Sequence, residues 1–247
     1  MLNGFWLNYN LIKERTIKMP SYLSSVVFIT LCLPFLNLNN SWHIALSLFC
    51  LTCIYVEITG LTSTNQIKER IFKTGFFLGF LILIDHSFLI FLPLLIGVLI
   101  YYNQVFWKYF IIQLIGLIYP LGAYNVLSKF SIITFNFTNP EIDLKLLYHD
   151  PKLLIVLFFI LTLALNELYK KTYKKTEKSK KGFNVIYTIS MLIIIQAILL
   201  NSLKFIYLLS LPIAIIIANY LIYLRYKKFQ TFLLGLLIIV FSIKIFI

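Results

Sequence analysis

Asp85 and His86 are adjacent ionisable residues inside an otherwise apolar stretch, and they are the strongest candidates for chemistry in this sequence. Ionisable side chains at membrane depth are costly and often functional. A carboxylate beside an imidazole could bind a cation, a phosphate through a metal, or a proton. The competing interpretation is that the pair reaches interfacial water and caps helix ends. The sequence leaves both interpretations open.

Other polar residues offer weaker candidates. Glu57 lies near one end of an apolar segment, where we expect its carboxylate to reach water or to pair with Lys73. An acidic segment further along could ligate a metal, although a solvated loop is the stronger expectation; it contains Glu141, Asp143, His149 and Asp150. Cys50 and Cys53 lie one helical turn apart, but no further ligands accompany them, so we interpret them as packing residues. We therefore expect no catalytic residues, no bound metal and no cofactor.

The elements that position these residues are apolar helices. Hydrophobic residues make up 60% of the 247 positions and charged residues only 13%, whereas soluble chains are about 45–50% apolar and about 25% charged. A helix that crosses a bilayer needs about 20 apolar residues. The composition therefore predicts an all-α, polytopic transmembrane helix bundle that forms one domain over residues 1–247. It leaves no room for an independent soluble catalytic domain.

Polar and basic segments divide the chain into about seven full spans. The predicted spans are 20–36, 42–60, 107–130, 153–167, 183–200, 205–223 and 229–247. The segment 61–73 is predicted to form a short amphipathic helix that lies in the membrane surface, because its charges fall away from Ile67 and Ile71. Pro120 is expected to kink the span that contains it.

The apolar block 74–102 is too long for one comfortable span and too short for two full ones. Asp85, His86 and Ser87 interrupt it near the middle. We predict a short helical hairpin over residues 73–102 that reverses near Asp85, with Lys73 and Lys108 on the same side. A single long tilted helix is the alternative.

The net charge of +13 is explained by topology. With alternating spans, 17 of the 22 Lys and Arg residues fall in segments on one side, which the positive-inside rule makes cytoplasmic. This assignment places the C-terminus outside the cytoplasm. The lysine run within 170–181 is expected to contact anionic lipid head groups. Nucleic acid is not an expected partner, whereas other membrane proteins are.

Three segments resemble an uncharacterised inner-membrane family of Bacteroidota, domain-of-unknown-function family 6427. They are QIKERIFKTGFFLGF at 66–80, WKYFIIQLIGLIYP at 107–120 and LLSLPIAIIIANY at 208–220. Their order and spacing agree with that family over most of the chain. The resemblance implies two further hydrophobic segments before the stretch that begins near Asn8, so this chain is expected to be shortened at its N-terminus.

The arrangement also looks loosely like membrane glycosyltransferases that use polyprenyl-phosphate sugars. Such enzymes need an external acid after the first span, and the corresponding turn, 37–41, has none. We therefore expect a non-enzymatic subunit or accessory factor in a cell-envelope process. A glycosyltransferase or an inactive relative is one alternative, and a small carrier with its site at Asp85 is another.

Overall fold

The computed structural model contains α-helices and short 3-10 helices throughout the part of the chain that it describes, in agreement with the all-α prediction. The described residues are 2–14, 16–17, 21–35, 41–62, 66–104, 106–129, 151–171, 175–200, 203–224 and 226–246. The α-helices are α1 (Leu2–Lys13), α2 (Leu23–Cys32), α3 (Ser41–Thr59), α4 (Ile67–Ile84), α5 (Leu92–Tyr101), α6 (Trp107–Lys129), α8 (Pro151–Lys171), α9 (Glu177–Leu199), α10 (Ser210–Ile222) and α11 (Lys227–Phe246). The 3-10 helices are η1 (Leu33–Phe35), η2 (Gly60–Thr62), η4 (His86–Phe91) and η6 (Leu203–Leu209).

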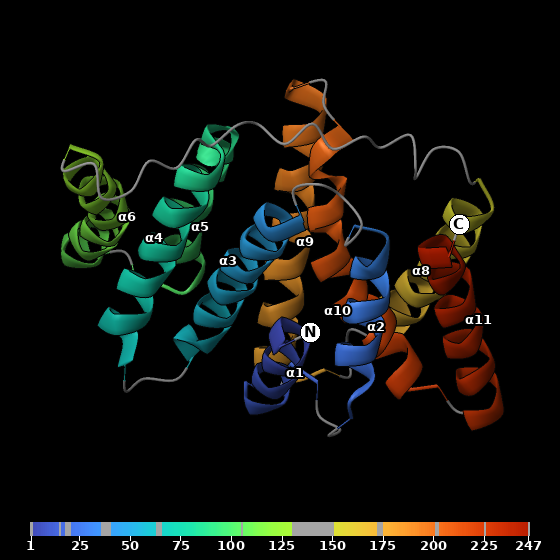
Figure 1. Cartoon of the computed structure of the whole chain (residues 1–247). Coiled ribbons are helices and arrows are strands. Elements are labelled where there is room, and N and C mark those ends of the chain that lie inside the picture. Colours follow the sequence, from blue (N-terminus) through green and yellow to red (C-terminus); the bar gives the residue numbers. More distant parts are fainter. Residues whose placement is uncertain are drawn as a thin grey trace.

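Helix α6 lies at one edge of the molecule, and α8 and α11 lie at the opposite edge (Figure 1). The central helices α3 and α10 are the most buried, with side chains such as Leu51, Ile54 and Ile217 fully inaccessible. The edge helix α6 buries only Gln113, Gly116 and Pro120. Its remaining surface is largely apolar, as expected of a helix that faces lipid or a partner.

Among the described residues, three helices are long and apolar enough to cross a membrane, which suggests a membrane protein. They are Trp42–Thr59, Trp107–Lys129 and Glu177–Leu199. Shorter apolar helices cover Leu23–Phe35, His86–Tyr101 and Ile206–Ile222. The prediction of seven full spans is therefore not supported by this part of the chain. One reason is visible near Pro34, where the first predicted span tightens into the 3-10 helix η1 after only ten α-helical residues.

The predicted surface helix over 61–73 is wrong. Residues 67–73 are the first two turns of α4, which continues without interruption to Ile84. The amphipathic pattern of this segment has a different cause, because Ile71 is buried in the core while the charged side chains line the end of the bundle. Helix α4 has 18 residues and is about 27 Å long, so it is longer than a first hairpin arm that begins at residue 73.

Helices α4 and α6 are parallel and pack backbone against backbone through glycines. A Cβ atom at Gly75 would lie 2.2 Å from the carbonyl oxygen of Gln113, and one at Gly79 would lie 2.3 Å from that of Leu117. A Cβ at Gly116 would in turn lie 2.3 Å from the carbonyl oxygen of Phe72. The small-xxx-small spacing of Gly75 and Gly79 is typical of such close helix packing in membranes.

The parallel packing explains the reversal at Asp85. Because α4 and α6 start at the same end of the molecule, the residues between them must return the chain along its whole length. Asp85 has an extended backbone (φ −151°, ψ 122°) that ends α4, and η4 followed by α5 runs back beside it (Figure 1). The reversal is where the sequence predicts it, and Lys73 and Lys108 lie toward the same end. One continuous helix over the block is excluded.

Candidate functional site

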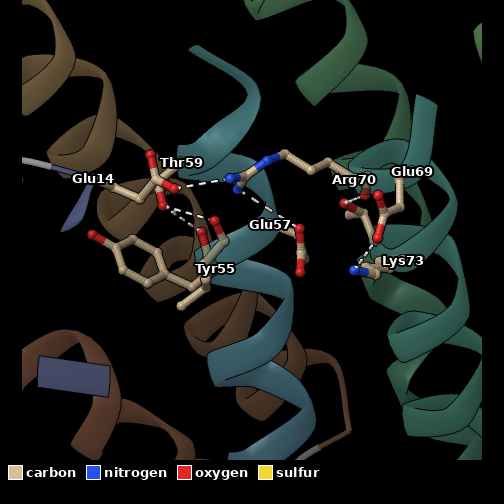
Figure 2. Close-up of polar contacts among 9 residues, drawn as sticks. Glu14, Tyr55, Glu57, Thr59, Glu69, Arg70 and Lys73 are labelled. Atoms are coloured by element: carbon tan, nitrogen blue, oxygen red, sulfur yellow. Dashed lines mark hydrogen bonds and ion pairs between the residues drawn. The ribbon is translucent and has the colours of Figure 1, made fainter. Parts of the chain in front are cut away.

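The most extensive polar site in the described residues is an ion cluster around Arg70, on the first turn of α4. Its Nη2 atom lies 3.0 Å from Oε1 of Glu14, just beyond the end of α1, and its Nη1 lies 3.7 Å from Oε2 of Glu57 on α3. Figure 2 shows the Arg70 side chain reaching across from α4 toward both carboxylates. One guanidinium therefore connects three helical segments.

The cluster is largely shielded from solvent. The side chains of Glu14, Arg70 and Glu57 are 8%, 13% and 14% exposed. Gly60, at the start of η2, leaves space for the guanidinium of Arg70, because a Cβ at this position would lie 1.4 Å from Nη1. At the neighbouring position, Thr59 donates its hydroxyl proton to the carbonyl oxygens of Tyr55 and Val56. The last turn of α3 is thus fixed where it meets Arg70 (Figure 2).

The sequence predicts that Glu57 reaches water or pairs with Lys73, whereas its ion-pair partner in the structure is Arg70. Lys73 lies 2.5 Å from Glu69, one turn away on α4, and both side chains are about half exposed. The i, i+4 spacing brings Lys73 and Glu69 together on one face of α4. Arg70 instead pairs with two carboxylates from other segments of the chain, Glu14 and Glu57. Glu14 and Arg70 are the residues that sequence reasoning missed. Their contact spans 56 positions, and no local spacing signals such a pair.

Several other contacts bring segments with basic residues to the same end of the molecule, which we call the basic end. Ser179 at the start of α9 donates to the carbonyl oxygen of Thr16, 2.9 Å away. Lys175 donates to Oδ1 of Asn219 on α10 at 3.1 Å, and its Nζ lies 3.4 Å from the centre of the Phe183 ring. Burial lowers the pKa of Lys175 to about 7. The ends of α1 and α10 thus meet the start of α9.

Asp85 and His86 lie at the opposite end of α4, and the two side chains do different things. Asp85 accepts hydrogen bonds at Oδ1 from the backbone N–H of Ser87, at 2.9 Å, and from the Ser87 hydroxyl. This is the N-cap of η4. His86 is exposed. The arrangement agrees with the capping interpretation, and a ligand at this turn remains a prediction.

The acidic segment with Glu141, Asp143, His149 and Asp150 lies outside the described residues, as does the turn 37–40. Elsewhere, the described chain has no group of three or more His, Cys, Asp or Glu side chains placed to hold a metal ion. Cys50 and Cys53 are buried in α3 with free thiols, consistent with packing residues.

The cluster therefore consists of one guanidinium shared by two carboxylates, and its ion pairs join segments of different helices. A guanidinium cannot act as a general acid or base near neutral pH, and both carboxylates contact it. Together, the apolar helices, the glycine packing and the paired charges define an all-α protein with membrane-compatible helices.

The chain belongs to a family of unknown function, DUF6427, whose model matches residues 1–247. Neither the curated proteins nor the solved structures include a significant match.

Proposed function

We propose that this protein is a multi-pass subunit or accessory factor of the bacterial inner membrane, without enzymatic activity, that supports a cell-envelope process by packing against partner membrane proteins. The observation that carries the proposal is the Arg70 cluster. Ionisable groups buried in the helix bundle of a membrane protein usually mark a binding or transport site. Here Arg70 is used instead to hold Glu14 and Glu57, and with them three segments of the chain.

The outer surface of α6 supports a role in helix packing. Ile115 and Ile118 are 53% and 58% exposed on this edge helix, and Trp107 is 76% exposed at its start. Such a face is suited to lipid or to an apolar helix of a partner. Because α6 is fixed to α4 through Gly75 and Gly116, the face is presented on a rigid support.

The proposed orientation puts the basic end in the cytoplasm and the C-terminus in the periplasm. Supporting it, Lys73, Lys108 and Lys175 lie toward one end of the described helices, as the positive-inside rule requires of cytoplasmic segments. In this proposal the chain crosses the membrane seven times, with the α4–α5 pair as an additional hairpin. Helices α8 and α11, of 21 and 20 residues, have sufficient length for such crossings. The lysines of 170–181 then lie against anionic head groups.

Co-purification tests the function. After extraction in mild detergent, a subunit should bring partners in fixed stoichiometry, whereas a glycosyltransferase or a carrier need not. Purification of the protein alone, from cells in which it complements a deletion, would contradict the proposal.

Reporter fusions test the orientation separately. A reporter after Ile247 should be active only in the periplasm, and one inserted near Lys175 only in the cytoplasm. Activity of both on one side of the membrane would refute the alternation while leaving the proposed function standing.

A further inference from the structure

A groove lies between α5 and α9. Its volume is about 250 Å³. Helix α5 contributes Leu94, Gly97 and Val98, and α9 contributes Val185 and Leu192. The two helices are antiparallel here, since Tyr101 meets Asn184 at one end of the groove while residues near 93 meet residues near 192 at the other. The walls are apolar along most of this length.

One end of the groove is polar and lies at the basic end of the molecule. There Asn184 donates from Nδ2 to the Tyr101 hydroxyl oxygen, 2.8 Å away. Lys181 lies one turn before Asn184 on α9, and its Nζ is 5.3 Å from the centre of the Tyr102 ring. Lys180 pairs with Glu177 at 3.5 Å, whereas Lys181 has no described carboxylate within ion-pair distance. Lys181 does not line the groove itself, but it lies one turn from Asn184, which does, and its ammonium group contacts the ring of Tyr102, next to the lining residue Tyr101.

We propose that this groove binds one anionic phospholipid, with an acyl chain between α5 and α9 and the phosphate at Lys181, Asn184 and Tyr101. Charge complementarity selects an anionic head group. The apolar walls match a hydrocarbon chain, and a helix about 10 Å across does not fit inside a groove of about 250 Å³, although it could cover the opening. The site lies at the leaflet that faces the basic end, so it rests on the proposed membrane orientation but not on the proposed subunit role.

Gly97 allows a direct test of the groove. A Cβ at this position would meet no atom within 4 Å, so Gly97→Leu should fold normally and occupy the space of the acyl chain. We would measure binding of phosphatidylglycerol to the purified protein by native mass spectrometry. The wild type should retain one lipid at low lipid excess, and Gly97→Leu should lose it.

Gly122→Leu is the matched control, because a Cβ at Gly122 on α6 also meets nothing within 4 Å. This variant should bind like the wild type. Equal lipid retention by Gly97→Leu and the wild type, at equal thermal stability, would overturn the proposed site.

Lys181 tests the recognition of the head group. Lys181→Gln should weaken phosphatidylglycerol binding about fivefold, the factor expected for one basic residue near a membrane surface. Lys228→Gln, which removes an exposed lysine from the first turn of α11, should leave the affinity unchanged. The wild type should also prefer phosphatidylglycerol to phosphatidylcholine. Equal affinity for the two lipids, or equal losses in the two lysine variants, would refute an anionic lipid at Lys181.

Discussion

The two ends of α4 hold their charges in different ways. At the basic end, Arg70 contacts Glu14 and Glu57, which come from other helices. At the opposite end, Asp85 contacts Ser87 in its own turn. The first arrangement depends on the assembly of the bundle, whereas the second could form in an isolated segment. The comparison indicates that charge at the basic end stabilises tertiary structure and that charge at the other end stabilises a local turn.

Removal of Arg70 should have the largest effect. Arg70→Met leaves Glu14 and Glu57 without their shared cation in a shielded site, and breaking such a buried pair costs about 3–5 kcal/mol. We expect a corresponding loss in the free energy of unfolding, measured by SDS titration in mixed micelles. Lys68→Met, at an exposed position on the same helix turn, should change it by less than about 0.5 kcal/mol. Similar losses in both variants would mean that the contacts of Arg70 with the two carboxylates do not stabilise the tertiary structure.

The second-largest loss of stability is expected from a substitution in the middle of α4. Gly75→Ala places a Cβ against the backbone of Gln113, where no rotamer change can relieve the contact. We expect a cost of about 1–3 kcal/mol from forcing α4 and α6 apart. Gly122→Ala, in open space on α6, is the control and should leave the thermal midpoint unchanged or slightly raised. A neutral Gly75→Ala would mean that the two helices are not in backbone contact.

A smaller loss of stability is expected from a substitution at the Asp85 turn. Asp85→Ala removes the side-chain acceptor of the η4 cap, for which a loss of about 0.5–2 kcal/mol in stability is typical.

Complementation of a deletion strain tests whether the same residue has a function. Under the subunit proposal, the Asp85→Asn variant, present at normal protein level, should fully complement the deletion strain and should still co-purify with its partners. Loss of complementation with partners retained would instead support a carrier or transferase site at this turn.

Lys175 should contribute a pH dependence of stability, an effect that differs in kind from the losses measured at fixed pH. Burial lowers its pKa to about 7, whereas in the unfolded chain the pKa is about 10.4. Between these values the unfolded state binds more protons, so stability should rise with pH from about 7 to 10. Contact of Nζ with the Phe183 ring favours the charged form and so limits the pH range over which stability rises. Lys175→Met should flatten this slope in thermal melts across that range, and an unchanged slope would contradict the assignment.

The reversal at Asp85 was predictable because it depends on local chemistry. An acid and two polar residues interrupt an apolar run, and the basic residues before and after the run point to the same side. The error over 61–73 has the opposite origin. Its amphipathic pattern fits both a helix on a membrane surface and the first turns of α4, and only the burial of Ile71 and the partners of Arg70 distinguish them.

Composition alone determined that this chain is helical and suited to a membrane, because apolar residues in runs of this length cannot satisfy their backbone groups in lipid except as helices. The sequence also located most helix boundaries, through its polar and basic segments. Tertiary structure decided which charges pair and which helices touch. Arg70 selects Glu14 across 56 positions, and Gly75 meets Gln113, because both contacts arise only when distant segments pack together. The spacing of residues along the sequence carries no information about which distant segments pack together.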